Sequence, residues 1–222
     1  MLEPLDPAGL DCVAVVGRHV ARADCFPLLK YEIDGVFDQC GPVDRVSVVD
    51  GSVEALSRLS PGELFYSDVN SATRREFLLN VIAYRDVSYS EDMAFARDVL
   101  VAGYRKAYQP AALVEHSNDV TLAEYPQRVF DETIGRRRVG ASLPVHGLLG
   151  TFARMAKDAL RGSARILRDP DYVFTSKLRW LAVNPRYVWA KWTSIRRASR
   201  MDLADPAVGK YSLEAQRALG NS

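Results

Sequence analysis

Residues 89–117 read YSEDMAFARDVLVAGYRKAYQPAALVEHS, and this stretch decides the fold class of the chain. Its first part repeats apolar residues at helical spacing, which predicts a helix over 91–102 with Ser90 as its N-cap. An apolar run at 111–114 follows, of the length and composition of a buried strand. A helix that leads into a buried strand is the building unit of an α/β layer structure.

The preceding residues continue this alternation. Val13–Val16 is an apolar run of strand type, and Phe26–Phe37 has the best helical pattern between residues 18 and 62. Leu64–Tyr66 is a candidate for a short strand. Ser71 is a candidate N-cap for a helix that runs from Thr73 to Asn80. The alternation of strands and helices over the first 120 residues predicts an α/β body.

The C-terminal part has a different character. Residues 121–139 are expected to be helical, and a stretch with Gly and Pro then leads to two basic amphipathic segments at about 150–168 and 173–200. We therefore expect two domains, residues 1–140 as the α/β body and residues 141–222 as a basic, Trp-rich helical extension.

The formal net charge of +1 hides an asymmetry between these parts. Residues 1–135 contain 12 basic and 22 acidic side chains, whereas residues 136–200 contain 15 basic and 3 acidic ones. An acidic body joined to a basic segment indicates that the basic segment meets an anionic partner. The three cysteines form no CxxC pair, which favours a reducing cytosol over a disulfide framework or a zinc site.

All three tryptophans, Trp180, Trp189 and Trp192, lie among the Lys and Arg residues of the basic segment. Tryptophan and cations on an amphipathic helix are typical of a membrane interface, so we expect a membrane surface to be contacted by residues 150–200. A helical hairpin that packs through its aromatic rings is the alternative. No nucleic-acid-binding motif is present, and we expect no nucleic acid as a partner.

Two acids, Glu91 and Asp92, fall in the first turn of the helix predicted over 91–102. The unpaired N–H groups and the dipole of a helix start favour a carboxylate and are expected to keep Asp92 ionised. The pair could take up a proton or bind a cation. Ordinary helix-start electrostatics is the alternative explanation.

Further polar side chains follow the predicted strands. His116 comes directly after the strand at 111–114, at the end where α/β sheets usually bind ligands. The loop at 67–72 contains Asp68, Asn70 and Ser71, which could hydrogen-bond a sugar or form an Asx-turn without any ligand. His19 has no acidic neighbour at metal-ligand spacing and is expected to be structural. There is no Walker-type glycine loop, GxGxxG or HExxH pattern, so NTP hydrolysis, dinucleotide redox chemistry and zinc proteolysis lack support.

Taken in order, several short motifs resemble one family. Residues 65–76, FYSDVNSATRRE, resemble the F-S-D-x-N-S-A-x-R-R-E segment of bacterial family 2 glycosyltransferases of the rhamnosyltransferase-like group. Residues 89–98, YSEDMAFARD, are similar to the Glu-Asp helix of that group, and the Gly17-Arg18 pair, the His116-Ser117 pair and the helix with Arg128 continue the pattern. The resemblance covers about residues 10–135, with the motifs in the family's order and at its spacing.

The resemblance implies part of a GT-A fold and an inverting transfer of a sugar, with rhamnose suggested, from a nucleotide-diphosphate donor to a cell-surface polysaccharide or lipid-linked acceptor. Asp92, beside Glu91, would be the base that accepts the proton of the acceptor hydroxyl. Asp68, Asn70 and Ser71 would line the acceptor or donor sugar, while Arg128 and His116 would face the diphosphate or its metal. A divalent cation, Mg²⁺ or Mn²⁺, is expected for the full-length enzyme, acting in the cytoplasm on the inner face of the cell membrane.

The resemblance begins just downstream of the family's metal-binding Asp-x-Asp motif, so we expect the chain to be the acceptor-side half of such an enzyme. The missing half would supply sheet neighbours for Val13–Val16, which are therefore expected to form an exposed strand edge. The alternative function is a catalytically inactive, glycosyltransferase-like protein that binds at a membrane surface.

Overall fold

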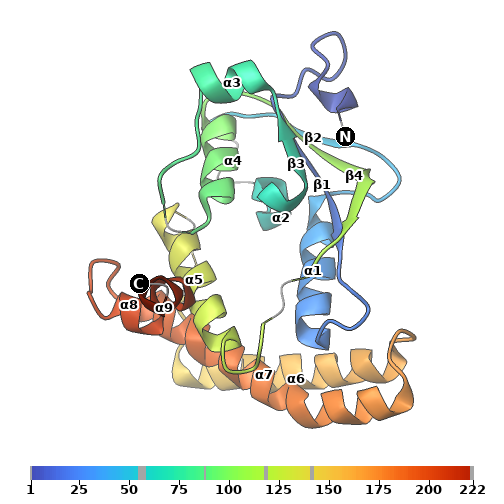
Figure 1. Ribbon diagram of the computed structural model, residues 1–222, viewed down its shortest axis with the longest axis vertical. Helices are drawn as coiled ribbons and strands as arrows, with labels where there is room; N and C mark the ends of the chain where they lie inside the picture. The colour runs from blue at the N-terminus through green and yellow to red at the C-terminus, as the bar shows by residue number, and fades with distance from the viewer. Residues whose placement is uncertain (1, 55–58, 88, 118–119, 141–142, 221–222) are drawn as a thin grey trace. The chain divides into compact units, whose positions relative to one another are not determined.

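The chain is α/β, with its elements arranged as in Figure 1. The computed structural model describes residues 2–54, 59–87, 89–117, 120–140 and 143–220. It divides into two compact units, unit 1 (Met1–Arg22 and Lys30–Ser117) and unit 2 (Ala23–Leu29 and Asn118–Ser222). The division therefore falls at residue 117 and not at residue 140 as expected from the sequence, because the helix that follows residue 120 belongs to unit 2.

Unit 1 is built on a mixed sheet of four strands in the order β2-β4-β1-β3. The central strands β1 and β4 are parallel, and the two outer strands each pair antiparallel with their neighbour. The strands are β1 (Ala14–Val20), β2 (Ser47–Val49), β3 (Ser71–Thr73) and β4 (Lys106–Glu115). Because β1 has neighbours on both sides, the expectation that Val13–Val16 form an exposed edge is wrong: β2 and β3 are the edges.

The helices of unit 1 in the described ranges lie before or between these strands. They are η1 (Glu3–Leu5), α1 (Pro27–Cys40, whose first residues belong to unit 2), α2 (Pro61–Leu64), η3 (Asp68–Asn70), α3 (Arg75–Asn80) and α4 (Glu91–Val101). The long helix predicted over 91–102 and the strands predicted at 13–16 and 111–114 are confirmed, although both strands extend further than predicted.

One face of the sheet carries the main core of unit 1. Val16 on β1 and Tyr108 on β4 pack with Phe37 of α1 and with Phe95 and Val99 of α4. Phe95 and Val99 are completely buried, as the helical spacing of apolar residues in 91–102 requires. The opposite face has a smaller cluster around Val15 and Ala107. The core therefore fixes α4, and with it Asp92, against the sheet.

A buried lysine starts β4. Lys106 is only 2% exposed, and its ammonium group donates to the carbonyl oxygen of Phe65 at 2.5 Å. Burial lowers the pKa of Lys106 to about 8. Sequence patterns did not extend the strand back to Lys106, since lysine is almost never fully buried.

The side chain of Asn70 joins the two central strands at a break in their register. Pairing passes from Gly17 opposite Gln109 to Arg18 opposite Leu113. At this break, the Nδ2 group of Asn70 donates to the carbonyl oxygens of Arg18 (3.1 Å) and Ala112 (2.8 Å). A Cβ atom on Gly17 would lie 2.3 Å from that Nδ2 atom and 2.4 Å from the oxygen of Ala112. Position 17 therefore has no room for a side chain, and only glycine fits there.

Two local predictions in this region are wrong. Leu64–Tyr66 does not form a strand, because Ser60 and Glu63 form a capping box that starts the one-turn helix α2. Ser71 does not cap a helix. It begins β3 and lies opposite Val16 of β1, and the helix that follows starts only at Arg75.

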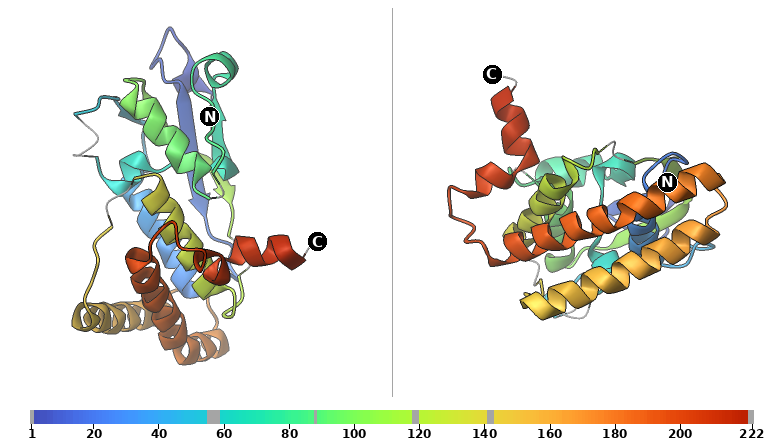
Figure 2. Two further views of the ribbon diagram at one scale, coloured as in Figure 1. Left: turned by 90° about the vertical axis from the view of Figure 1, so that its left-hand side faces the viewer. Right: turned by 90° about the horizontal axis from the view of Figure 1, so that it is seen from below.

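Unit 2 is helical. It contains α5 (Tyr125–Arg138), α6 (Leu148–Arg168), α7 (Phe174–Arg200), α8 (Val208–Tyr211) and α9 (Leu213–Gly220). The helices α6 and α7 lie side by side as a hairpin, which Figure 2 shows most clearly in its right-hand view. Among the helices of the described residues, none combines the length and apolar character that crossing a bilayer would need.

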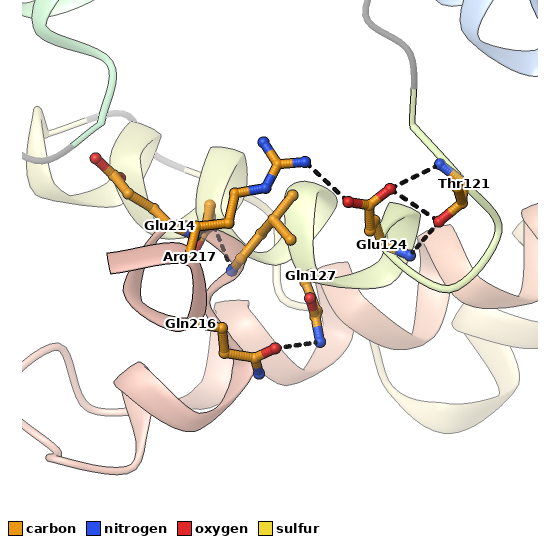
Figure 3. A network of polar contacts seen from close by, with 8 residues as sticks. Thr121, Glu124, Gln127, Glu214, Gln216 and Arg217 are labelled. Carbon is orange, nitrogen blue, oxygen red and sulfur yellow. Dashed lines mark hydrogen bonds and ion pairs between the residues drawn. The ribbon is translucent and has the colours of Figure 1, made fainter. Parts of the chain in front are cut away.

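A polar network attaches α9 to the start of α5 (Figure 3). Glu124 accepts hydrogen bonds from the backbone N–H and the hydroxyl of Thr121, and the guanidinium of Arg217 donates to it at 2.8 Å. The hydrogen bonds from Arg217 and Thr121 lower the pKa of Glu124 to about 2. Gln127 donates to Gln216 at 3.0 Å in the same network. These contacts give the C-terminal helix a defined place on α5.

Candidate functional site

Asp92 lies in the first turn of α4, as predicted, but the helix begins differently. Ser90 has a left-handed backbone (φ 64°, ψ 30°), and its side chain makes no capping hydrogen bond. Instead, the Oδ1 atom of Asp92 accepts a hydrogen bond from the backbone N–H of Met93 at 2.7 Å. The prediction that the Ser90 side chain caps α4 is therefore wrong, and a strained residue directly precedes the candidate acids.

Replacing Ser90 by glycine is expected to stabilise the protein. A residue with a Cβ atom is disfavoured at positive φ by roughly 1–2 kcal/mol, whereas glycine is not, so Ser90→Gly is expected to raise the free energy of unfolding by about 1 kcal/mol. Urea denaturation would measure it. Ser90→Ala keeps the Cβ atom and is the matched control, and an equal gain in that variant would contradict the explanation.

The carboxylate of Asp92 is half-buried in an acidic cluster with Asp68 and Glu91. Burial is the main cause that raises the pKa of Asp92 to about 6, and the charges of Asp68 and Glu91 raise it further. Hydrogen bonds from the backbone N–H groups of Met93 and Asp68 act in the opposite direction. The helix start was expected to hold the acid firmly ionised. Burial exceeds that effect.

This shift changes what Asp92 can do chemically. At neutral pH a carboxyl group with a pKa of about 6 is still mostly ionised, at about nine-tenths. It is a stronger proton acceptor than an ordinary aspartate, since its pKa lies closer to the working pH. The site is therefore suited to general-base catalysis on a hydroxyl group.

Aromatic side chains form the wall beside these acids. Tyr84 stacks on Phe95 with ring centroids 4.6 Å apart, and its hydroxyl donates to Oδ1 of Asp68 at 2.7 Å. The hydroxyl of Tyr66 lies 2.9 Å from Oγ1 of Thr73 and is also hydrogen-bonded to Ser71. Burial raises the pKa of both tyrosines, so both remain protonated donors. Sequence reasoning missed both, because neither residue falls in a pattern that distinguishes it from core.

The structure places the residues predicted to line a sugar in two different environments. Asp68 and Ser71 belong to the cluster around Asp92 through their contacts with the two tyrosines. Asn70 turns its amide group toward the backbone of β1 and β4, where both N–H bonds of the amide are used. Its role in the described structure is to hold the two central strands together.

A second group of polar side chains lies at the carboxyl ends of the parallel strands β1 and β4. The rings of His19 and His116 meet edge to face with centroids 5.9 Å apart. The backbone N–H of His116 donates to the backbone oxygen of Val20 at 2.8 Å. His19 is buried, and its Nε2 atom has no hydrogen-bond partner among the described residues. Burial, followed by the neighbouring His116, lowers the pKa of His19 to about 4. Sequence patterns did not pair His19 with His116, because the two residues are far apart along the chain.

Arg128 lies on α5 and belongs to unit 2, whereas Asp68, Asp92 and His116 belong to unit 1. Within the described ranges, no three His, Cys, Asp or Glu side chains converge in a way that could hold a metal ion. The divalent cation that the resemblance implies for the full-length enzyme stays a prediction.

Comparison with known proteins gives no relative: no protein-family model, curated protein or solved structure matches the chain.

Proposed function

We propose that unit 1 is the acceptor-side part of an inverting glycosyltransferase of GT-A type, with Asp92 as the base. The observation that carries the proposal is the half-buried carboxylate of Asp92, whose pKa is raised to about 6 beside hydroxyl-bearing and aromatic side chains. Such a carboxylate would take the proton of an acceptor hydroxyl as that oxygen attacks the anomeric carbon and the nucleoside diphosphate leaves. Glu91 sustains the raised pKa by its charge.

The expected substrates follow from the same resemblance. The donor is a nucleotide-diphosphate sugar, and the acceptor is a cell-surface glycan or a lipid-linked sugar at the inner face of the membrane. The hydroxyl group of Tyr84 and the carboxylate of Asp68 would supply the polar contacts that orient the acceptor, whereas Tyr66 is completely buried behind them.

Replacing Asp92 by asparagine tests the proposal. With a panel of nucleotide-diphosphate sugars and lipid-linked acceptors, Asp92→Asn is expected to lower kcat by about 10²- to 10⁴-fold while the donor Kd stays unchanged, since the base acts only in the chemical step. Asp86→Asn, in an exposed carboxylate outside the cluster, is the control. Release of nucleoside diphosphate and product mass are the readouts. Full activity of Asp92→Asn would refute the assignment.

The pH dependence provides a second test. Because the base must be ionised, kcat/KM of the wild-type chain is expected to rise with pH through an apparent pKa near 6 and then level off. A profile that is flat through that region would contradict the role of Asp92.

A non-catalytic membrane-binding protein is the second candidate. Large apolar side chains that are exposed on α6 and α7, among them Leu149, Leu160 and Trp189, favour it. Vesicle binding without sugar transfer to any acceptor in the panel would support this candidate over the first.

A further inference from the structure

The hairpin of α6 and α7 has a well-packed inner side. Asn184 on α7 donates to the oxygen of Ala159 at 3.1 Å and to Ser163 at 3.3 Å, next to Gly162, where a larger residue would crowd it. Trp192 donates its indole N–H to Asp158 at 2.9 Å. The two helices are therefore joined along one face of each.

A different side of α6 is apolar and exposed. Leu149, Leu160 and Leu167 fall on one stripe of the helix, and Leu149 and Leu160 are 86% and 73% exposed. Ala156 lies on the same stripe. A helix surface that faced only water would carry polar residues here, so the stripe indicates an apolar partner.

The neighbouring helix α7 has a matching stripe. Phe174, Leu178 and Trp189 recur at helical spacing, and Phe174 and Trp189 are 74% and 55% exposed. The ring of Trp189 lies 6.1 Å from that of Phe152 on α6, with both side chains exposed, so the two stripes meet on one side of the hairpin. We define the exposed apolar face as Leu149, Leu160, Leu167, Phe174, Leu178 and Trp189.

The structure separates the three tryptophans that the sequence grouped together. Trp180 and Trp192 pack against the core of unit 2, and Trp192 also has the cations of Arg154 and Lys191 over its ring. Trp189 alone of the three is an exposed residue. The packing explanation therefore holds for Trp180 and Trp192, and only Trp189 has the exposure that a membrane contact would need.

Cations flank the exposed apolar face. Lys157, Arg161 and Arg168 are exposed on the adjoining stripe of α6, and Arg179 and Arg186 are exposed on α7. Residues 148–200 contain twelve basic and three acidic side chains. Long cationic side chains beside exposed Leu, Phe and Trp are the arrangement by which a helix lies in the headgroup region of a bilayer.

We propose that the exposed apolar face binds the surface of an anionic phospholipid bilayer, with α6 and α7 lying in its plane. The cations beside this face favour an anionic bilayer over a second copy of the chain, and the apolar side chains favour it over nucleic acid. A second copy would bring two rims of arginine together, which is repulsive, and nucleic acid would leave the leucines without an apolar partner. An anionic bilayer satisfies both the cations and the apolar side chains. The face lies entirely in unit 2 and requires no activity from the acidic cluster of unit 1.

Vesicle co-sedimentation of the full chain tests the proposal. We expect binding to vesicles of phosphatidylcholine with phosphatidylglycerol, weaker binding at high salt, and little binding to phosphatidylcholine alone. Leu149→Gln/Leu160→Gln is expected to lower the partition coefficient at least about tenfold, since it removes two exposed leucines that the bilayer would bury. The control Leu79→Gln/Leu113→Gln changes two exposed leucines of unit 1 and is expected to bind like wild type. Unchanged thermal melting of each variant checks its folding.

Fluorescence gives an independent measurement on the same face. In a Trp180→Phe/Trp192→Phe background, Trp189 is expected to be quenched by bromine-labelled phosphatidylglycerol. Absence of vesicle binding, equal binding by the Leu149→Gln/Leu160→Gln variant, or unquenched Trp189 would overturn the proposal. It would also be overturned if that variant changed only the oligomeric state, or if the chain bound an oligonucleotide in preference to vesicles.

Discussion

Asn70→Asp is expected to lower the free energy of unfolding by about 3 kcal/mol at neutral pH. The amide of Asn70 donates to the carbonyl oxygens of Arg18 and Ala112, and each such hydrogen bond contributes about 1 kcal/mol. A carboxylate of the same shape cannot donate, and it would place negative charge against both oxygens. Urea denaturation followed by circular dichroism measures the change.

Two comparisons make this result specific. Asn80→Asp changes an exposed asparagine on α3 that donates to Glu76 at 2.9 Å, and the loss of this exposed contact is expected to cost less than about 1 kcal/mol. Gly17→Ala is expected to cost about 2 kcal/mol by crowding the same amide, and its cost should shrink when Asn70 is already alanine. Strictly additive losses would show that Gly17 and Asn70 do not act together.

Asp92→Asn is expected to make the protein more stable at neutral pH, by about 1–2 kcal/mol. The pKa of Asp92 is raised from 3.8 to about 6. Between these two values the folded chain holds a proton that the unfolded chain has released, so stability falls as pH rises through this window. The full shift corresponds to about 3 kcal/mol, which partial exposure to solvent reduces.

The pH at which unfolding is measured separates this effect from simple loss of charge. The gain from Asp92→Asn is expected at neutral pH and should vanish near pH 4, where Asp92 is protonated in the folded chain. Asp86→Asn should change little at either pH. A variant that is less stable at neutral pH would show that the hydrogen bonds to Asp92 outweigh its burial. A gain in stability with loss of sugar transfer is typical of a residue kept for function.

The helices and central strands could be predicted because their patterns are local. Helix 91–101 has apolar residues at helical spacing, and α6 and α7 match the segments predicted at 150–168 and 173–200 closely. The strand predicted at Leu64–Tyr66 is wrong because three apolar residues suit a strand or a helix end equally. The capping box at Ser60 favours the helix α2. The prediction that Ser71 caps a helix is wrong because Ser71 pairs with β1, whose residues are far away in the sequence.

The candidate site could be predicted only in part. Asp92, Asp68 and Ser71 were identified and do lie in one cluster, but Tyr66 and Tyr84 were not. Whether a tyrosine packs in a core or faces a carboxylate depends on tertiary contacts that no spacing encodes. The pKa of Asp92 was misjudged for the same reason, since the burial that raises it comes from the surrounding fold and not from the turn in which it lies.

The short segment Ala23–Leu29 has a consequence for any attempt to divide this protein. It belongs to unit 2 although unit 1 surrounds it in the sequence, and Phe26 stacks on Tyr187 with ring centroids 4.4 Å apart. The hydroxyl of Tyr172 donates to the oxygen of Cys25 at 2.6 Å. The chain therefore passes between the units three times, and one cut in the gene cannot yield two complete halves. A fragment that ends at residue 117 would expose Phe26 and Leu28 to water, and the complementary fragment would lack the residues that fill its own core.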